Sequence, residues 1–352
     1  MAASISSALL LLLNMAGALL SPRAPPPAPA ALTGAGDGED VDFFFFPFLV
    51  LYKSGRVVRF IGTDTVPASM DPATGVASKD VVIDADAGLA VRLYLPNVAN
   101  LTAGKRGGGD KLPVVVFYHG GGFVTESAFS PTYHRYLNAL VSKARVVAVS
   151  VEYHLAPEHR LPRAYDDAWA ALRWVLENAG AGPEPWLSRH GDTARLFLVG
   201  DSAGGNIAHN VAMRAGGEGG AARRRGHPRR GSPRPLLLGE AAGAVGDGGP
   251  GDAAVAGADV GVRVRGARRL GRARVLVTVA SLDTLSARGR AYVAAARASG
   301  WGGEAVLYET PGENHVYFLV EPDGEKAAKE MDAVVAFINE GEQVITASRM
   351  DA

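Results

Sequence analysis

Four apolar residues, 196–199, lead directly into Gly200-Asp201-Ser202-Ala203-Gly204, and a helix-forming segment follows at once. This order predicts a nucleophile elbow, in which a strand ends, the chain turns sharply and a helix begins. Ser202 would lie at the apex, where the helix N-terminus offers N–H groups to a developing oxyanion. Glycine is expected at 200 and 204 because a Cβ atom there would collide with the neighbouring strand or helix. The alternative is a glycine-rich turn that carries a solvated serine.

The rest of the chain alternates between strands and helices. Continuous apolar runs predict buried parallel strands at residues 114–118, 146–151, 196–199, 275–280 and 305–308. Helices are predicted at residues 163–177, 286–299 and 324–339, and two antiparallel strands at 80–84 and 89–94. This alternation predicts an α/β protein with a mostly parallel sheet that is covered by helices on both faces.

Composition excludes several classes of function. The chain has 352 residues, of which 47% are hydrophobic, so it can bury a large core. Its 36 basic and 36 acidic residues give no net charge, and we expect no binding of nucleic acid. The absence of cysteine excludes disulfides, thiolate catalysis and cysteine-ligated zinc. We predict no metal site and no cofactor. Nothing in the sequence fixes the oligomeric state.

Residues 1–41 are predicted to be an extension, signal-like or disordered. The apolar run 8–20 is too short to span a bilayer, so no stable membrane insertion is expected. The residues before it lack the Lys and Arg of a signal peptide, and Arg is too scarce for a typical transit peptide. We therefore predict a cytoplasmic protein, with secretion as the alternative if residues 1–30 act as a signal peptide.

An aromatic segment at residues 43–52 is followed by a turn at 53–56 and by the apolar residues 57–60. An exposed cluster of this kind promotes aggregation, so we expect it to pack on the body of the protein or over a pocket.

Residues 222–274 do not fit the pattern of the single α/β domain predicted for residues 42–352. They hold 12 Arg and 12 Gly and no sustained apolar run beyond Leu236-Leu237-Leu238. A segment that binds single-stranded nucleic acid would carry interleaved aromatic residues, and this one has none. We expect a disordered insertion, or sequence that selection did not shape, such as a shifted reading frame or a retained intron. The segment does not look able to build the next strand of the sheet.

A serine hydroxyl becomes a good nucleophile when a base, usually a histidine, removes its proton. Three histidines follow the elbow: His209, His227 and His315. His209 lies too far along the helix behind the elbow, and His227 falls in the Arg/Gly segment. His315 follows strand 305–308 at its carboxyl end, where sites form in such sheets, and is the predicted base.

The base needs a carboxylate that orients it, and elbow proteins carry that acid between the serine and the histidine. Asp283 is the only acid in the loop after strand 275–280. It is the predicted orienting residue, and the alternative is an N-cap for the next helix.

An oxyanion hole requires backbone N–H groups that converge on one point. His119-Gly120-Gly121-Gly122 directly follows strand 114–118, and the glycines allow the backbone to approach a substrate carbonyl. We predict that Gly120, Gly121 and Gly122 form the hole together with the N–H of Ala203. The alternative is a plain glycine turn.

Seven motifs link the chain to a known family: FFFPF at 44–48, YKSGR at 52–56, DPATGV at 71–76, YHGGGF at 118–123, YHLAPEH at 153–159, GDSAGGN at 200–206 and GENHV at 312–316. The set resembles the plant carboxylesterases of the hormone-sensitive-lipase group, which are similar to the gibberellin receptors. The resemblance implies an α/β-hydrolase fold, an N-terminal lid over an apolar pocket and small carboxylic esters as substrates. It also implies a triad of Ser202, Asp283 and His315, with an oxyanion hole at Gly120–Gly122.

Two features depart from the family. His154 stands where the family has arginine, and residues 222–274 lack the expected apolar strand ending in a His-Pro-Tyr-like turn, of which His227-Pro228 is a candidate remnant.

The predicted function is a carboxylesterase that hydrolyses small carboxylic esters through a Ser-His-Asp acyl-enzyme mechanism. One alternative is a non-catalytic, gibberellin-like hormone receptor, although such receptors replace the base histidine that this chain keeps. A second is an ester-converting lyase, and a third is an inactive product of a damaged gene model.

Overall fold

The computed structural model describes residues 40–98, 111–224, 236–240 and 274–347. Its centre is an eight-stranded sheet with the order β11-β10-β9-β8-β6-β7-β5-β4. The strands are β4 Ala77–Asp84, β5 Leu89–Leu95, β6 Leu112–Tyr118, β7 Val147–Glu152, β8 Gly191–Gly200, β9 Leu236–Glu240, β10 Arg274–Ala280 and β11 Glu304–Thr310. Neighbouring strands are parallel from β7 across to β11, and the pairs β5–β7 and β4–β5 are antiparallel. The predicted mostly parallel sheet is confirmed.

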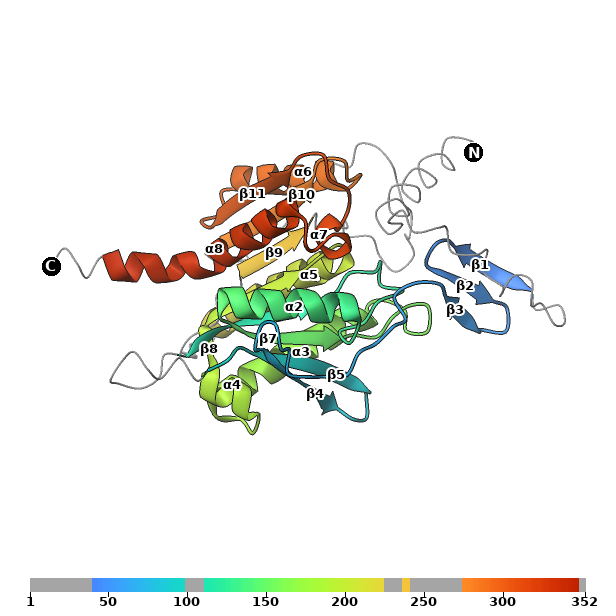
Figure 1. Cartoon of the computed structure of the whole chain (residues 1–352), viewed down its shortest axis with the longest axis horizontal. Coiled ribbons are helices and arrows are strands. Elements are labelled where there is room, and N and C mark those ends of the chain that lie inside the picture. The colour runs from blue at the N-terminus through green and yellow to red at the C-terminus, as the bar shows by residue number, and fades with distance from the viewer. Residues whose placement is uncertain (1–39, 99–110, 225–235, 241–273, 348–352) are drawn as a thin grey trace.

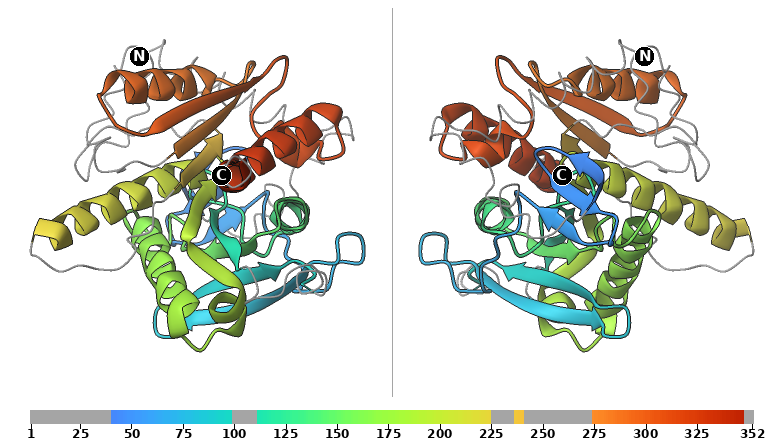
Figure 2. Two further views of the ribbon diagram at one scale, coloured as in Figure 1. Left: turned by 90° about the vertical axis from the view of Figure 1, so that its left-hand side faces the viewer. Right: turned by 90° about the vertical axis from the view of Figure 1, so that its right-hand side faces the viewer.

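Helices cover both faces of the sheet (Figures 1 and 2). One face packs against α3 Arg163–Ala181, α4 Pro185–His190, α5 Ala203–Arg224 and α6 Ser286–Ala298, and the other packs against α2 Pro131–Ala144 and α8 Glu325–Ala347. Strand β6 shows why its run is apolar throughout. Val114, Val116 and Tyr118 face the first layer, whereas Val115 and Phe117 face the second. Successive side chains point to opposite faces, so a strand buried on both sides needs no polar residue.

Helix α2 was not predicted, although its start signal is present in the sequence. Ser130 is the N-cap, and its hydroxyl accepts a hydrogen bond from the N–H of Tyr133. Pro131 follows in the first turn, where a missing N–H has no cost. Ser-Pro before an amphipathic run was a readable sign that this helix begins there.

Strand β9 corrects the expectation about residues 222–274. It pairs in parallel with β8 on one side and with β10 on the other, so the sheet has no gap between the elbow strand and the strand before Asp283. Its core is Leu236-Leu237-Leu238, the one apolar run in the segment. Three leucines are enough for a short central strand here, because the backbone of β9 forms hydrogen bonds with a neighbouring strand on each side. Helix α5 also extends into the segment, to Arg224. Residues 225–235, with His227-Pro228, and residues 241–273 lie outside the described residues, as does the extension 1–39.

A small antiparallel sheet of β1 Val41–Phe45, β2 Leu49–Tyr52 and β3 Val57–Arg59 lies at one end of the molecule (Figure 1). We call it, with the following residues up to Gly62, the lid. The expected burial of its aromatic cluster is only partly correct. Phe48 is buried, whereas Phe43, Phe44 and Phe46 are each about half exposed.

The turn after β8 is a close backbone contact. A Cβ atom on Gly204 would lie 1.9 Å from the carbonyl oxygen of Tyr118, and one on Gly200 would lie 2.4 Å from the carbonyl carbon of Gly204. Real Cβ atoms do not approach other atoms so closely, so both positions require glycine, as predicted.

Replacing Gly204 with alanine should therefore destabilise the protein by about 3 kcal/mol or more, because backbone atoms cannot yield as a flexible side chain can. Urea denaturation of Gly204→Ala beside Gly302→Ala measures the effect. Gly302 is exposed and has open space around its Cβ position, so that variant should change stability by no more than about 0.5 kcal/mol. Equal midpoints for the two variants would contradict the proposed contact.

Candidate active site

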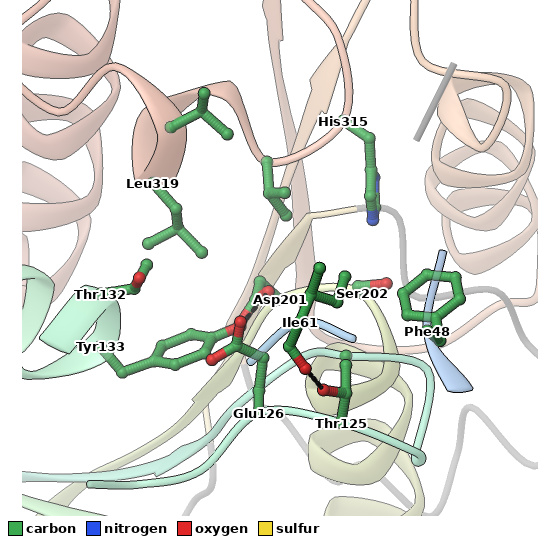
Figure 3. Close-up of a pocket in the computed structure, with 13 residues that line it drawn as sticks. Phe48, Ile61, Thr125, Glu126, Thr132, Tyr133, Asp201, Ser202, His315 and Leu319 are labelled. Carbon is green, nitrogen blue, oxygen red and sulfur yellow. Dashed lines mark hydrogen bonds between the residues drawn. The ribbon is translucent and has the colours of Figure 1, made fainter. Parts of the chain in front are cut away.

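Ser202 sits at the junction of β8 and α5 with φ = 51°, in the left-handed region that non-glycine residues rarely adopt. Gly200 and Gly204 make this turn possible by letting the backbone close against β6. The side chain lines a pocket that it shares with His315 (Figure 3). The predicted elbow residue is therefore strained and faces a cavity, as a nucleophile at this position must be.

His315 and Asp283 come from two neighbouring loops at the carboxyl ends of their strands. Asp283 follows β10, and His315 lies between β11 and the short helix α7 Tyr317–Val320. The imidazole Nδ1 and the carboxylate Oδ2 are 2.8 Å apart, and both side chains are buried. Asp283 also accepts a hydrogen bond from the N–H of Leu285 through Oδ1, so it holds the start of the next helix as well as the histidine.

The other ring nitrogen of His315 points into the pocket. Its Nε2 is buried and has no hydrogen-bond partner among the described residues. Figure 3 shows the ring directed toward Ser202. Since Nδ1 faces a carboxylate, that nitrogen carries the proton and Nε2 has a free lone pair that can accept one.

His209, set aside on its position in the sequence, has a structural role. Its Nδ1 lies 3.1 Å from the hydroxyl of Tyr292, and burial lowers its pKa to about 4. It is a neutral side chain between α5 and α6, and it does not line the pocket.

The glycine loop after β6 carries three predicted donors, of which Gly121 lines the same pocket as Ser202. Gly121 and Gly122 have φ of +93° and +62°, which favours glycine at both positions. Among the described residues, no acceptor faces the N–H groups of Gly121, Gly122 or Ala203. Gly120 differs from this set, because its N–H donates to the hydroxyl of Tyr133 at 2.8 Å. The predicted set of three glycine donors therefore reduces to two, with Gly120 serving to anchor the loop.

Tyr133 and Asp201 form a buried link that was not predicted. The hydroxyl of Tyr133 donates to Asp201 Oδ2 at 2.8 Å while it accepts from Gly120. Asp201 is almost fully buried, and this burial, offset in part by the hydrogen bond and by nearby His315, raises its pKa to about 6. Glycine at 120 is required here too, because a Cβ would lie 2.3 Å from Asp201 Oδ2. An acid directly before the nucleophile was the only available signal in the sequence.

The pocket has a volume of about 290 Å³. Its walls carry both apolar and polar side chains. The residues are Phe48, Ile61, Gly121, Thr125, Glu126, Thr132, Tyr133, Asp201, Ser202, His315, Val316, Leu319 and Val320. Phe48 and Ile61 belong to the lid, so the lid forms one wall of the cavity that contains Ser202.

Arg59 fastens the lid to the body. Its guanidinium forms two hydrogen bonds to Glu158, at 2.6 and 2.8 Å, and donates to the carbonyl oxygens of Val124 and Ala156. Thr125 makes a second connection, since its hydroxyl donates to the carbonyl of Ile61. Val124 and Thr125 follow the glycine loop after one intervening residue, so the lid and the candidate oxyanion donors are held by one segment.

Within the described ranges, no three His, Asp or Glu side chains come together as a metal site would require. No helix in that part of the chain is long and apolar enough to cross a membrane.

Comparison with known proteins identifies α/β-hydrolase relatives over most of the chain. A family model described as α/β hydrolase fold matches residues 115–234. The chain is 42% identical to the chloroplastic tuliposide A-converting enzyme 2 of Tulipa gesneriana, over 90% of this chain and 84% of that protein. It is 40% identical to the Arabidopsis thaliana protein named Probable carboxylesterase 5, over 84% of this chain and 97% of the relative.

Solved structures of esterases share the architecture. A thermophilic carboxylesterase cloned from a metagenomic library has a TM-score of 0.55 at 25% identity, over 78% of this chain and 91% of that one. An esterase of Pyrobaculum calidifontis has a TM-score of 0.53 at 27% identity, over 75% and 85% of the two chains.

The buried carboxyl of Asp201 should leave a signature in stability. Its pKa is raised from 3.8 to about 6, so between these pH values the folded protein binds a proton that the unfolded chain has released. The contribution of Asp201 to the free energy of unfolding is fully present below pH 3.8, and it is lost as the pH rises through 6. Asp201→Asn does not titrate, and its free energy of unfolding relative to the wild type should rise over this window, by on the order of 3 kcal/mol. Urea denaturation across the pH range measures it, and a constant difference would rule the burial effect out.

Removing the Arg59 connection should lower activity on any ester that the pocket accepts. Arg59→Ala frees the lid and the segment that carries the glycine donors, so kcat/KM should fall by about tenfold or more. Arg59→Lys should not rescue it, because an ammonium cannot reproduce the fork of donors. Lys53→Ala is the matched control, since Lys53 forms an exposed ion pair with Asp40 on the same sheet. Equal activity of the alanine variants would show that the connection is dispensable.

Proposed function

The chain belongs to the plant carboxylesterases of the α/β-hydrolase fold, and on this basis we propose that it hydrolyses small carboxylic esters with Ser202 as nucleophile, His315 as general base and Asp283 as the residue that orients the base. The observation that supports this best is the buried His315–Asp283 pair at 2.8 Å, whose free Nε2 shares one pocket with Ser202.

In the proposed mechanism, Ser202 Oγ attacks the ester carbonyl as His315 Nε2 takes its proton. The negative charge on the carbonyl oxygen is stabilised by the N–H groups of Gly121, Gly122 and Ala203. His315 then gives the proton to the leaving alcohol, and Asp283 stays ionised and stabilises the imidazolium. A water molecule, activated by His315, releases the acid and restores the serine.

The alternative of a non-catalytic receptor is not favoured, because the base histidine is present and paired with a carboxylate. Relatives in Tulipa gesneriana are named for converting tuliposide A, which makes ester conversion without hydrolysis a second candidate. Product analysis separates the two, because hydrolysis releases one acid for each alcohol.

The cellular location stays a prediction. Relatives are named as chloroplastic, amyloplastic and mitochondrial proteins, and the cytoplasm remains our expectation for this chain until a tagged full-length protein is imaged.

Replacement of the proposed catalytic groups provides the main test of the mechanism. With p-nitrophenyl butyrate, Ser202→Ala and His315→Gln should each lower kcat by about 10³-fold or more. Asp283→Asn should also lower kcat, by up to about 10⁴-fold, because the amide can hold the imidazole in the wrong tautomer. Its Oδ1 can still accept from Leu285, so the loop should stay folded.

His190→Gln is the control, since His190 lies at the end of α4, away from the pocket. Full activity in the Ser202→Ala variant would refute the mechanism.

A further inference from the structure

One acid in the pocket belongs neither to the proposed mechanism nor to the Tyr133–Asp201 link. Glu126 lines the cavity beside Ser202, yet its Oε2 is buried and has no partner among the described residues. No lysine or arginine in that part of the chain compensates its charge, and the charged groups that act on it are two further acids, Asp201 and Asp64. A buried carboxyl oxygen without a partner is costly, so its persistence in a substrate pocket points to a ligand group that completes it.

The surrounding segment holds Glu126 in one position. Its φ is +72°, a strained value for a residue with a side chain. The preceding residues are fixed to the lid through the carbonyl of Val124 and the hydroxyl of Thr125. On the other side, Ser127 and the N–H of Ala128 donate to Glu152 at 2.8 and 2.6 Å. Strain that is maintained from both sides at a pocket is typical of a functional residue.

The chemistry around the carboxyl favours an uncharged partner. Burial raises the pKa of Glu126, and the neighbouring acids raise it further, whereas a hydrogen bond with Ser130 acts in the opposite direction. A carboxyl that readily holds a proton can donate as well as accept, which matches a hydroxyl group. Thr132, another polar residue of the same wall, adds a second hydroxyl.

The position of Glu126 also indicates which half of an ester it meets. In Figure 3, His315 lies above Ser202, and Glu126 lies below it and to the left. The leaving alcohol must come within reach of His315 Nε2, because that nitrogen gives it a proton. The acyl group therefore extends toward Glu126. We propose that Glu126 is a specificity-determining residue that binds a hydroxyl on the acyl chain, so that esters of short hydroxy acids are the preferred substrates. This inference rests on the proposed esterase function.

The test compares p-nitrophenyl butyrate with the p-nitrophenyl esters of both enantiomers of 3-hydroxybutyrate, which share a leaving group. The quantity measured is the ratio of kcat/KM for the better hydroxyacyl ester to that for the butyrate. In the wild type this ratio should exceed about ten, because a hydrogen-bonding site discriminates against a substrate that leaves it unpaired. Glu126→Gln keeps the shape and the hydrogen bonds, and its ratio should stay within about threefold of the wild type. Glu126→Met keeps the length without hydrogen bonding, and its ratio should fall to about one.

Two results would overturn the proposal: no preference in the wild type, or the same ratio in Glu126→Met as in the wild type. A wild-type preference for the 4-aminobutyrate ester over both hydroxyacyl esters would also overturn it, in favour of a cation site. Failure of the wild type to hydrolyse even the butyrate would refute the esterase function itself, which the ratio does not test. Thermal denaturation of the two variants checks that each is folded.

Discussion

Gly200 and Gly204 bring the backbone of the elbow against the end of strand β6, and this approach determines where Ser202 lies. A Cβ atom on Gly204 would lie only 1.9 Å from the carbonyl oxygen of Tyr118. Any side chain at this position would therefore push β8 and α5 away from β6. The glycine loop begins two residues after Tyr118, and the close approach therefore also sets the distance between the nucleophile and its candidate oxyanion donors. Ser202 has φ = 51° at this turn, a strained value for a residue with a side chain.

The Tyr133–Asp201 link also fixes the elbow relative to the glycine loop, through side chains instead of backbone contacts. One hydroxyl joins the residue before the nucleophile to the first glycine of the loop, and it does so in a buried site where each bond is hard to replace with water. Burial of the Asp201 carboxyl is unfavourable when the group is ionised. This burial therefore lowers stability, while the link fixes the position of Ser202 relative to Gly121. Natural active sites often carry such local costs, which the rest of the fold offsets.

Sequence alone selected the candidate residues whose positions depend on chain order. Ser202, Asp283 and His315 follow strand ends in a sheet whose topology places those ends together, so position along the chain was sufficient to select them. It did not predict that Gly120 would donate its N–H to Tyr133, because Tyr133 lies on α2, a helix that only the fold brings beneath the loop. It also underestimated β9. Three leucines carry little propensity signal by themselves, and the strand forms because partners are available on both sides.

The segment that follows the glycine loop couples the lid to two functions at once. Gly121 and Gly122 are proposed donors to the oxyanion, and Glu126, four residues after Gly122, lines the same cavity as Gly121. Arg59 and Glu152 fix this segment at its two ends. The N–H groups of Val124 and Thr125 donate to the carbonyl of Gly121 at 3.0 and 3.1 Å, so a displacement at Glu126 is transmitted to Gly121. An acyl group that satisfies Glu126 thereby helps to hold the oxyanion donors in place, and its binding energy contributes to the transition state as well as to the ground state.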